Sequence, residues 1–130
     1  MIYVDTSILL AQLLAEDRRP PPRLWESPLA SSRLVEYETW TRLHARKLGA
    51  SHGPAARELL ARIAMVELSP LVLARALESF PAPLRTLDAL HWASFEYLRG
   101  QRLEIRLATY DERLASVARK LRAPLFALGR

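Results

Sequence analysis

The sequence predicts a single α/β domain in which a parallel sheet is covered by helices on both faces. Short apolar runs rich in strand-forming residues alternate with amphipathic stretches along the 130 residues, and this alternation is typical of parallel sheets. Half of the residues are hydrophobic, which is enough for a core and argues against disorder. No repeat, low-complexity segment or domain linker interrupts the pattern, so residues 1–130 are interpreted as one domain.

The first half of the chain contains two expected strands and two expected helices. Strands are expected at residues 2–4 and 28–30, and helices at residues 6–16 and 32–48. The second helix is expected to be closed by Gly49 as a C-terminal stop. Residues 18–23 carry three consecutive prolines and are expected to form a rigid loop.

The second half continues the same alternation. Helices are expected at residues 54–64, 71–80, 85–99 and 111–121, and strands at residues 65–68, 104–109 and 125–128. Ser69-Pro70 supplies an N-cap and a first-turn proline for the helix that follows, and Gly100 closes the next one. In open sheets of this kind, ligands bind beyond the carboxyl ends of the strands.

The composition sets the charge and the chemistry available to the chain. The formal net charge is +5 and the isoelectric point about 10.2, and nearly all of the positive charge is carried by arginine. Arginine suits phosphate oxygens, although a solvated arginine-rich surface would give the same composition. The absence of cysteine excludes disulfides, thiolate metal sites and cysteine nucleophiles. No apolar stretch reaches the ~18 residues of a membrane span. The N-terminus lacks the positive region of a signal peptide, so a cytoplasmic protein is expected.

Four acidic residues stand beside apolar segments, where an unpaired carboxylate is costly. They are Asp5, Glu38, Asp88 and Asp111. Asp5 and Asp111 each follow an expected strand, and the carboxyl ends of parallel strands meet at one edge of a sheet. Carboxylate oxygens that converge at such an edge would form a site for a hard cation.

Each of these acids also has an ordinary structural explanation. Asp5 and Asp111 precede expected helices, where they would act as N-caps. Asp88 lies in the first turn of an expected helix, where its negative charge interacts favourably with the helix dipole, although its face of the helix is otherwise apolar. Glu38 has a competitor in Glu36, two residues earlier, and spacing alone does not choose between them.

Several side chains near the acids allow two interpretations. His91 could donate to a phosphate or a carboxylate, but a histidine on an apolar helix face is more often a core residue. The hydroxyls of Thr6, Ser7 and Thr109 could support the neighbouring carboxylates or cap helices. Tryptophans can stack on bases, but packing or a subunit interface explains the three present here more simply; they are Trp25, Trp40 and Trp92.

Four segments, taken in chain order, resemble the motifs of a known family. They are Ile2-Tyr3-Val4-Asp5-Thr6-Ser7, Ser32-Arg33-Leu34-Val35-Glu36-Tyr37-Glu38, residues 84–93 around Asp88, and Thr109-Tyr110-Asp111-Glu112-Arg113-Leu114. Each motif is short, but all four in this order resemble the PIN-domain ribonucleases, and among them the VapC-type toxins of toxin–antitoxin pairs. The second segment is similar to the family's Ser-x-Leu-x-x-x-Glu motif, which selects Glu38 over Glu36.

The resemblance implies a three-layer α/β/α sandwich with a central, mostly parallel sheet. It also implies an endoribonuclease that depends on Mg²⁺ or Mn²⁺, is active as a homodimer and is blocked by a cognate antitoxin protein. Asp5, Glu38, Asp88 and Asp111 would be both the catalytic residues and the metal ligands, directly or through water. The resulting hypothesis is in-line attack of metal-activated water on an RNA phosphodiester bond, which leaves 5′-phosphate and 3′-hydroxyl ends.

Other classes of protein fit the sequence less well. A phosphoaspartate signalling domain needs a lysine near its acid, but neither of the two lysines, Lys47 and Lys120, ends an expected strand. A haloacid-dehalogenase-type phosphatase needs a second aspartate two residues after its nucleophile, where this chain has Ser7. The main alternative is a catalytically inactive PIN-like module that binds RNA or protein, although all four expected acids are present.

Overall fold

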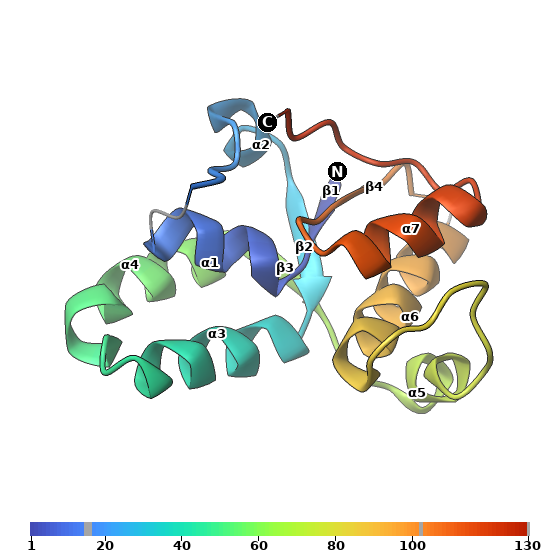
Figure 1. Ribbon diagram of the computed structural model, residues 1–130, viewed down its shortest axis with the longest axis horizontal. Coiled ribbons are helices and arrows are strands. Elements are labelled where there is room, and N and C mark those ends of the chain that lie inside the picture. The colour runs from blue at the N-terminus through green and yellow to red at the C-terminus, as the bar shows by residue number, and fades with distance from the viewer. Residues whose placement is uncertain (15–16, 102, 130) are drawn as a thin grey trace.

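The structure is a computed structural model that describes residues 1–14, 17–101 and 103–129. Its strands are β1 (Ile2–Val4), β2 (Leu29–Ser32), β3 (Ile63–Val66) and β4 (Arg106–Ala108). Its helices are α1 (Thr6–Leu14), α2 (Pro22–Trp25), α3 (Leu34–Ala45), α4 (Gly49–Ala61), α5 (Pro70–Ala76), α6 (Thr86–Gly100) and α7 (Glu112–Lys120). The strands lie in the middle, with α1, α3 and α4 on one side and α5, α6 and α7 on the other (Figure 1).

The sheet is parallel throughout and has the strand order β3-β2-β1-β4. Tyr3 in β1 lies opposite Ala30 in β2 and Leu107 in β4. The expected last strand at residues 125–128 is wrong, because only Leu125 forms a bridge, with Leu107. The next residue, Phe126, is buried in the core beside β1 and β4, so its side chain anchors this segment where a longer ladder was expected.

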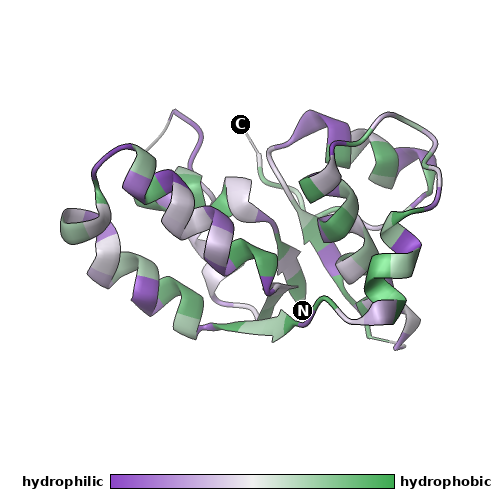
Figure 2. Cartoon of the chain, turned by 90° about the horizontal axis from the view of Figure 1, so that it is seen from below, coloured by the Kyte–Doolittle hydropathy of each residue, from purple (hydrophilic) through white to green (hydrophobic). Residues whose placement is uncertain are grey.

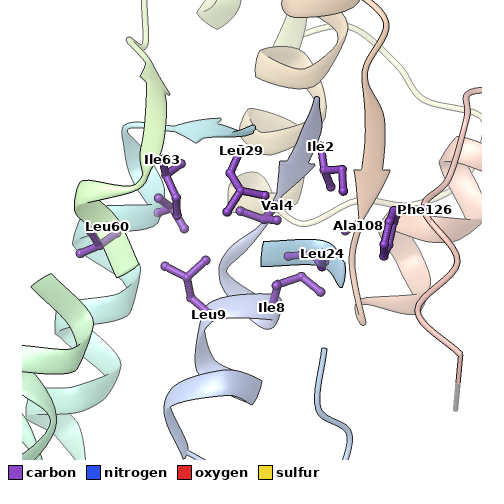
Figure 3. Close-up of a cluster of buried hydrophobic side chains, with 11 residues drawn as sticks. Ile2, Val4, Ile8, Leu9, Leu24, Leu29, Leu60, Ile63, Ala108 and Phe126 are labelled. Carbon is purple, nitrogen blue, oxygen red and sulfur yellow. The ribbon is translucent and has the colours of Figure 1, made fainter. Parts of the chain in front are cut away.

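Side chains alternate between the two faces of the sheet and build a core on each. One face carries Ile2 and Val4, which pack with residues of α1, α2, α3 and α4 (Figure 3). The opposite face carries Tyr3, which packs with residues of α6 and α7. Figure 2 shows the two groups of helices from below, on either side of the strands. The expected three-layer α/β/α sandwich is therefore confirmed.

Several helix boundaries differ from the expected ones because the chain turns earlier than the glycine pattern suggested. The helix expected to run to residue 48 ends at Ala45, and Lys47 then adopts a positive φ of 58°. Gly49 begins α4 instead of stopping α3, and a Cβ there would lie only 2.8 Å from Nδ1 of His44. Pro54 lies inside α4, and β3 starts at Ile63, two residues before the expected strand.

The N-terminal third contains two further differences. The expected helix 6–16 is observed as Thr6–Leu14, and residues 15–16 lie outside the described part of the chain. The proline-rich loop expected at residues 18–23 ends in the short helix α2, because Pro22 occupies a first-turn position where its missing N–H costs nothing. The tryptophans pack as expected, with Trp92 fully buried and Trp25 and Trp40 against the core.

The strand order determines where a ligand can bind. Connections lead from β1 outward to β2 and β3, whereas β4 lies on the other side of β1, so the order reverses between β1 and β4. Ligands in open α/β sheets bind at such a reversal, beyond the carboxyl ends of the strands. Asp5 follows β1 there, and Thr109 follows β4. No helix in the described ranges is long and apolar enough to cross a membrane.

Candidate active site

A pocket of about 840 Å³ opens at this edge of the sheet, and all four candidate acids line it. Asp5 follows β1, Glu38 lies on α3, Asp88 lies in the first turn of α6, and Asp111 precedes α7. Glu36 is not among the lining residues; it forms an ion pair with Arg33 at 3.7 Å on another side of α3. The geometry therefore separates the two glutamates that spacing alone left open.

Asp5 is buried, and a hydroxyl group donates to each of its carboxylate oxygens. Ser7 Oγ donates to Oδ1, and Thr109 Oγ1 donates to Oδ2. The two hydroxyls are themselves fixed, because Ser7 Oγ accepts from the N–H of Tyr110 and Thr109 Oγ1 from the N–H of Asp111, both at 2.9 Å. Burial raises the pKa of Asp5, and His91 and the two hydroxyls oppose this rise.

Glu38 reaches the pocket from α3 and is held through one oxygen. Its Oε1 accepts from Thr6 Oγ1 at 2.7 Å and lies 2.7 Å from His91 Nε2. His91 is 2% exposed, as the core interpretation predicted, yet its ring also contacts a pocket carboxylate. Thr6 and Thr109 are likewise buried beside the carboxylates, so these hydroxyls do support the acids.

Asp88 carries the clearest electrostatic signature of the site. Its pKa is raised from 3.8 to about 6, mainly by burial and then by the charges of Asp111 and Asp5. Glu38 adds to the rise, and His91 opposes it. The neighbouring negative charges disfavour the ionised form of this carboxylate, and a bound cation would stabilise that form.

Asp111 combines the two interpretations that the sequence left open. Its Oδ1 accepts from the backbone N–H groups of Arg113 at 2.8 Å and Leu114 at 3.2 Å, so it is the N-cap of α7. It also lines the pocket and contributes to the raised pKa of Asp88. Capping and pocket lining are therefore compatible roles for one residue.

Basic and aromatic residues surround the acids, and sequence reasoning did not identify them. The lining includes Arg18, Arg42, Arg85, Arg113 and Tyr37. Tyr37 is 65% exposed, and Arg18 lies 4.9 Å from the centre of the Tyr110 ring. The sequence contains a signal for Arg42, because it follows Glu38 by one helical turn and therefore lies on the same face of the helix.

The donor set fits a hard divalent cation in its chemistry. The four acids supply only carboxylate oxygens, the ligand type that Mg²⁺ and Mn²⁺ prefer. Within the described ranges, however, no three His, Asp or Glu side chains are close enough together to form a ready metal cluster. Mg²⁺ keeps several of its waters, so contact with some of these carboxylates through water would satisfy it.

The comparison with known proteins identifies the family. Residues 2–120 match the model of the PIN domain. The chain belongs to the PIN-domain family. Two curated relatives are ribonucleases of Mycobacterium tuberculosis: VapC46, 32% identical over 92% of both chains, and VapC47, 31% identical over 93% of this chain and 92% of the relative. This PIN domain is thus a VapC-type ribonuclease by similarity along nearly its whole length.

A solved structure agrees with this placement. VapC20 of Mycobacterium tuberculosis, described as a toxin that cleaves the sarcin–ricin loop, is 25% identical to this PIN domain. The two structures superimpose with a TM-score of 0.67 over 89% of this chain and 94% of VapC20. The parallel sheet and its flanking helices are therefore shared with a structure of the same family.

Proposed function

We propose that this VapC-type ribonuclease is an endoribonuclease that depends on Mg²⁺ or Mn²⁺ and serves as the toxin of a toxin–antitoxin pair. The observation that carries the proposal is the convergence of Asp5, Glu38, Asp88 and Asp111, from four separate segments, in one pocket. The raised pKa of Asp88, caused mainly by burial and then by the charges of Asp111 and Asp5, supports it, because a bound cation would stabilise the ionised carboxylate.

In this proposal the four acids hold the cation, directly or through water. Asp5 is oriented by Ser7 and Thr109, and Asp111 by its capping bonds. A bound Mg²⁺ or Mn²⁺ supplies Lewis acidity, which activates water and neutralises charge on the phosphate. The acids therefore set where the scissile phosphate lies, and hydrolysis leaves a 5′-phosphate and a 3′-hydroxyl end.

The substrate in this proposal is RNA, and the arginines that line the pocket beside the four acids are called the basic rim. Arg42, Arg85 and Arg113 line the pocket beside the acids, where their guanidinium groups suit flanking phosphates. Tyr37 offers an exposed ring on which an unstacked base can lie. Recognition of unstacked bases is the common mode for sequence-specific RNA binding, so a loop or single strand is the expected target.

The proposed partners are a second copy of the chain and a cognate antitoxin in the cytoplasm. Leu71 of the short helix α5 and Leu77, just after its end, are 68% and 89% exposed, and such exposed apolar groups suit a protein interface. The antitoxin is proposed from the similarity to the VapC ribonucleases. Sedimentation of the purified chain tests the dimer, because a monomer at micromolar concentration would contradict it.

The activity is tested by replacing acids one at a time. Asp5→Asn and Asp88→Asn are expected to lower the rate of RNA cleavage in Mg²⁺ at least 100-fold, because each removes a charged oxygen donor. Asp17→Asn changes an exposed aspartate and serves as the matched control. EDTA should abolish cleavage by the wild type. Full activity of Asp5→Asn would reject the site, and RNA binding without cleavage by the wild type would favour the inactive binding module.

A further inference from the structure

A continuous set of hydrogen bonds leads from the sheet to Glu38 through Tyr3 and His91. The N–H of Ser32 donates to Tyr3 Oη at 3.1 Å. Tyr3 Oη lies 2.8 Å from His91 Nδ1, and His91 Nε2 lies 2.7 Å from Glu38 Oε1. Tyr3, Ser32 and His91 are all buried, so water does not compete for these bonds.

The donors and acceptors in this set can be assigned in one direction. The Tyr3 oxygen already accepts from a backbone N–H, and its proton is therefore left to donate to His91 Nδ1. Burial raises the pKa of Tyr3 well above its usual value, so the phenol keeps that proton. The nearby hydroxyls of Ser31 and Ser94 donate to main-chain carbonyl oxygens, and the Tyr3 oxygen makes its shorter bond, at 2.8 Å, with His91 Nδ1. When His91 is neutral, it then carries its hydrogen on Nε2 and donates it to Glu38.

We propose that Tyr3 and His91 are positioning residues that hold the Glu38 carboxylate in a single orientation. Tyr3 selects the Nε2–H tautomer of His91, and His91 donates to Oε1 of Glu38. Thr6 donates to the same oxygen at 2.7 Å. Two donors on Oε1 leave Oε2 as the oxygen available to a ligand in the pocket. This assignment rests on the proposed function only in treating Glu38 as part of the site.

His91 is among the residues that line the pocket, but it is almost fully buried and so offers little surface to RNA. The side chain of His91 is 3% exposed, whereas that of Glu38 is 19% exposed. An ordinary core histidine needs partners for its two nitrogens, but those partners need not face a pocket. Here the acceptor on Nε2 is a pocket carboxylate, and the partner on Nδ1 comes from the central strand β1. Partners of this kind fix ligand orientation in metal sites.

The first test measures Mn²⁺ binding to the RNA-free protein by calorimetry. Tyr3→Phe and His91→Leu are expected to weaken the affinity about 10-fold or more, the usual effect of losing an orienting partner. His91→Gln should recover most of this loss, because its amide N–H can reach the position of Nε2. Tyr97→Phe makes the same chemical change as Tyr3→Phe on α6, outside the pocket, and should leave the affinity unchanged. Unchanged affinity in both Tyr3→Phe and His91→Leu would overturn the proposal.

The second test reads the tautomer directly and needs neither metal nor RNA. Long-range ¹H–¹⁵N spectra of protein labelled at histidine should show His91 as the Nε2–H tautomer, with His91→Gln used to assign its signals. His44 and His52, both on the surface side of their helices, serve as internal references. Tyr3→Phe should release the fixed tautomer. Circular dichroism checks folding; if Tyr3→Phe does not fold, the wild-type spectrum decides, and a His91 in the Nδ1–H form overturns the proposal.

The two tests separate this proposal from the proposed function. A wild-type protein that binds no Mn²⁺ and cleaves no RNA would contradict the metal-dependent ribonuclease. The spectra would still decide the role of Tyr3 and His91, because the hydrogen bonds belong to the protein alone. A fixed Nε2–H tautomer that is lost in Tyr3→Phe supports the proposal, and any other tautomeric state rejects it.

Discussion

Thr109 donates a hydrogen bond to Asp5, although 104 residues separate them in the chain. The contact arises because β1 and β4 are neighbours, with Val4 opposite Ala108, so the residues that follow these two lie side by side. The same Thr109 hydroxyl accepts from the N–H of Asp111 at 2.9 Å. One hydroxyl group therefore connects two of the four acids of the pocket.

The first prediction concerns this hydroxyl. Thr109→Val removes the donor to Asp5 and leaves the Asp111 N–H without its acceptor, so the RNA cleavage rate should fall about 10-fold or more. Thr109→Ser keeps the hydroxyl and should retain most of the activity. Both rates are measured at saturating Mg²⁺ on the same RNA. Equal activity of the valine and serine variants would show that the hydroxyl does not position Asp5.

The second prediction concerns the pH dependence of stability without metal. The pKa of Asp88 rises from 3.8 to about 6 on folding, so between these values the folded state binds more protons than the unfolded state. The contribution of Asp88 to stability therefore falls as pH rises through this window, and it stays low above it. In Asp88→Asn this loss is absent, so its melting temperature relative to the wild type should increase from pH 4 to pH 7.

Thermal melts in EDTA measure this difference. Asp17→Asn is the matched control, because it removes an exposed aspartate with the same change in net charge. Asp5 and Asp111 interact with Asp88, so the comparison reports the titration of these coupled acids together. A melting-temperature difference between Asp88→Asn and wild type that stays constant from pH 4 to pH 7 would show that folding does not raise the pKa of Asp88.

The third prediction concerns the basic rim. Arg42 lines the pocket on α3, and Arg46 is exposed at the end of the same helix outside the lining. In an Asp5→Asn background, which is expected to suppress cleavage, Arg42→Gln should weaken RNA binding and reduce the slope of log affinity against log salt by about 0.7, the value for one phosphate contact of a single strand. Arg46→Gln should leave the slope unchanged. Identical slopes in the two variants would place the bound RNA elsewhere.

The fourth prediction concerns the stability of α3. Thr39 is fully buried, and within the described ranges its hydroxyl has no hydrogen-bond partner. Thr39→Val keeps the shape and removes the unpaired polar group, so the free energy of unfolding should rise by about 1 kcal/mol in urea titrations. Thr41→Val changes an exposed threonine on the same helix and should have little effect. A loss of stability in Thr39→Val would indicate a partner for the hydroxyl, such as a buried water.

The sequence predicted the elements of the fold better than their ends. The apolar runs at residues 2–4 and 104–109 became adjacent strands because their side chains alternate between two cores. The end of α3 was missed because Lys47 adopts a left-handed conformation that the nearby glycine was expected to provide. This turn is closed by local bonds from the N–H groups of Lys47 and Leu48 to the carbonyl oxygens of His44 and Leu43, with lysine at the position that glycine usually occupies.

The sequence also predicted some residues of the candidate site and missed the roles of others. Local pattern located Asp5 and Asp111, because both follow strands that end at the same edge of the sheet. The choice between Glu38 and Glu36 needed the family motif, since the two differ only in which side of α3 faces the pocket. The role of His91 could not be read from the sequence, because its partners Tyr3 and Glu38 come from other segments of the chain.

The bond between Thr109 and Asp5 also determines when the pocket can be complete. β1 pairs with β2 early in the chain, but its other edge is filled only by β4. A fragment that ends after α6 but before residue 109 therefore retains Asp5, Glu38 and Asp88 but lacks both Asp111 and the hydroxyl on Oδ2 of Asp5. During translation, the N-terminal acids are made first, and the pocket is complete only after β4, Thr109 and Asp111 have been added.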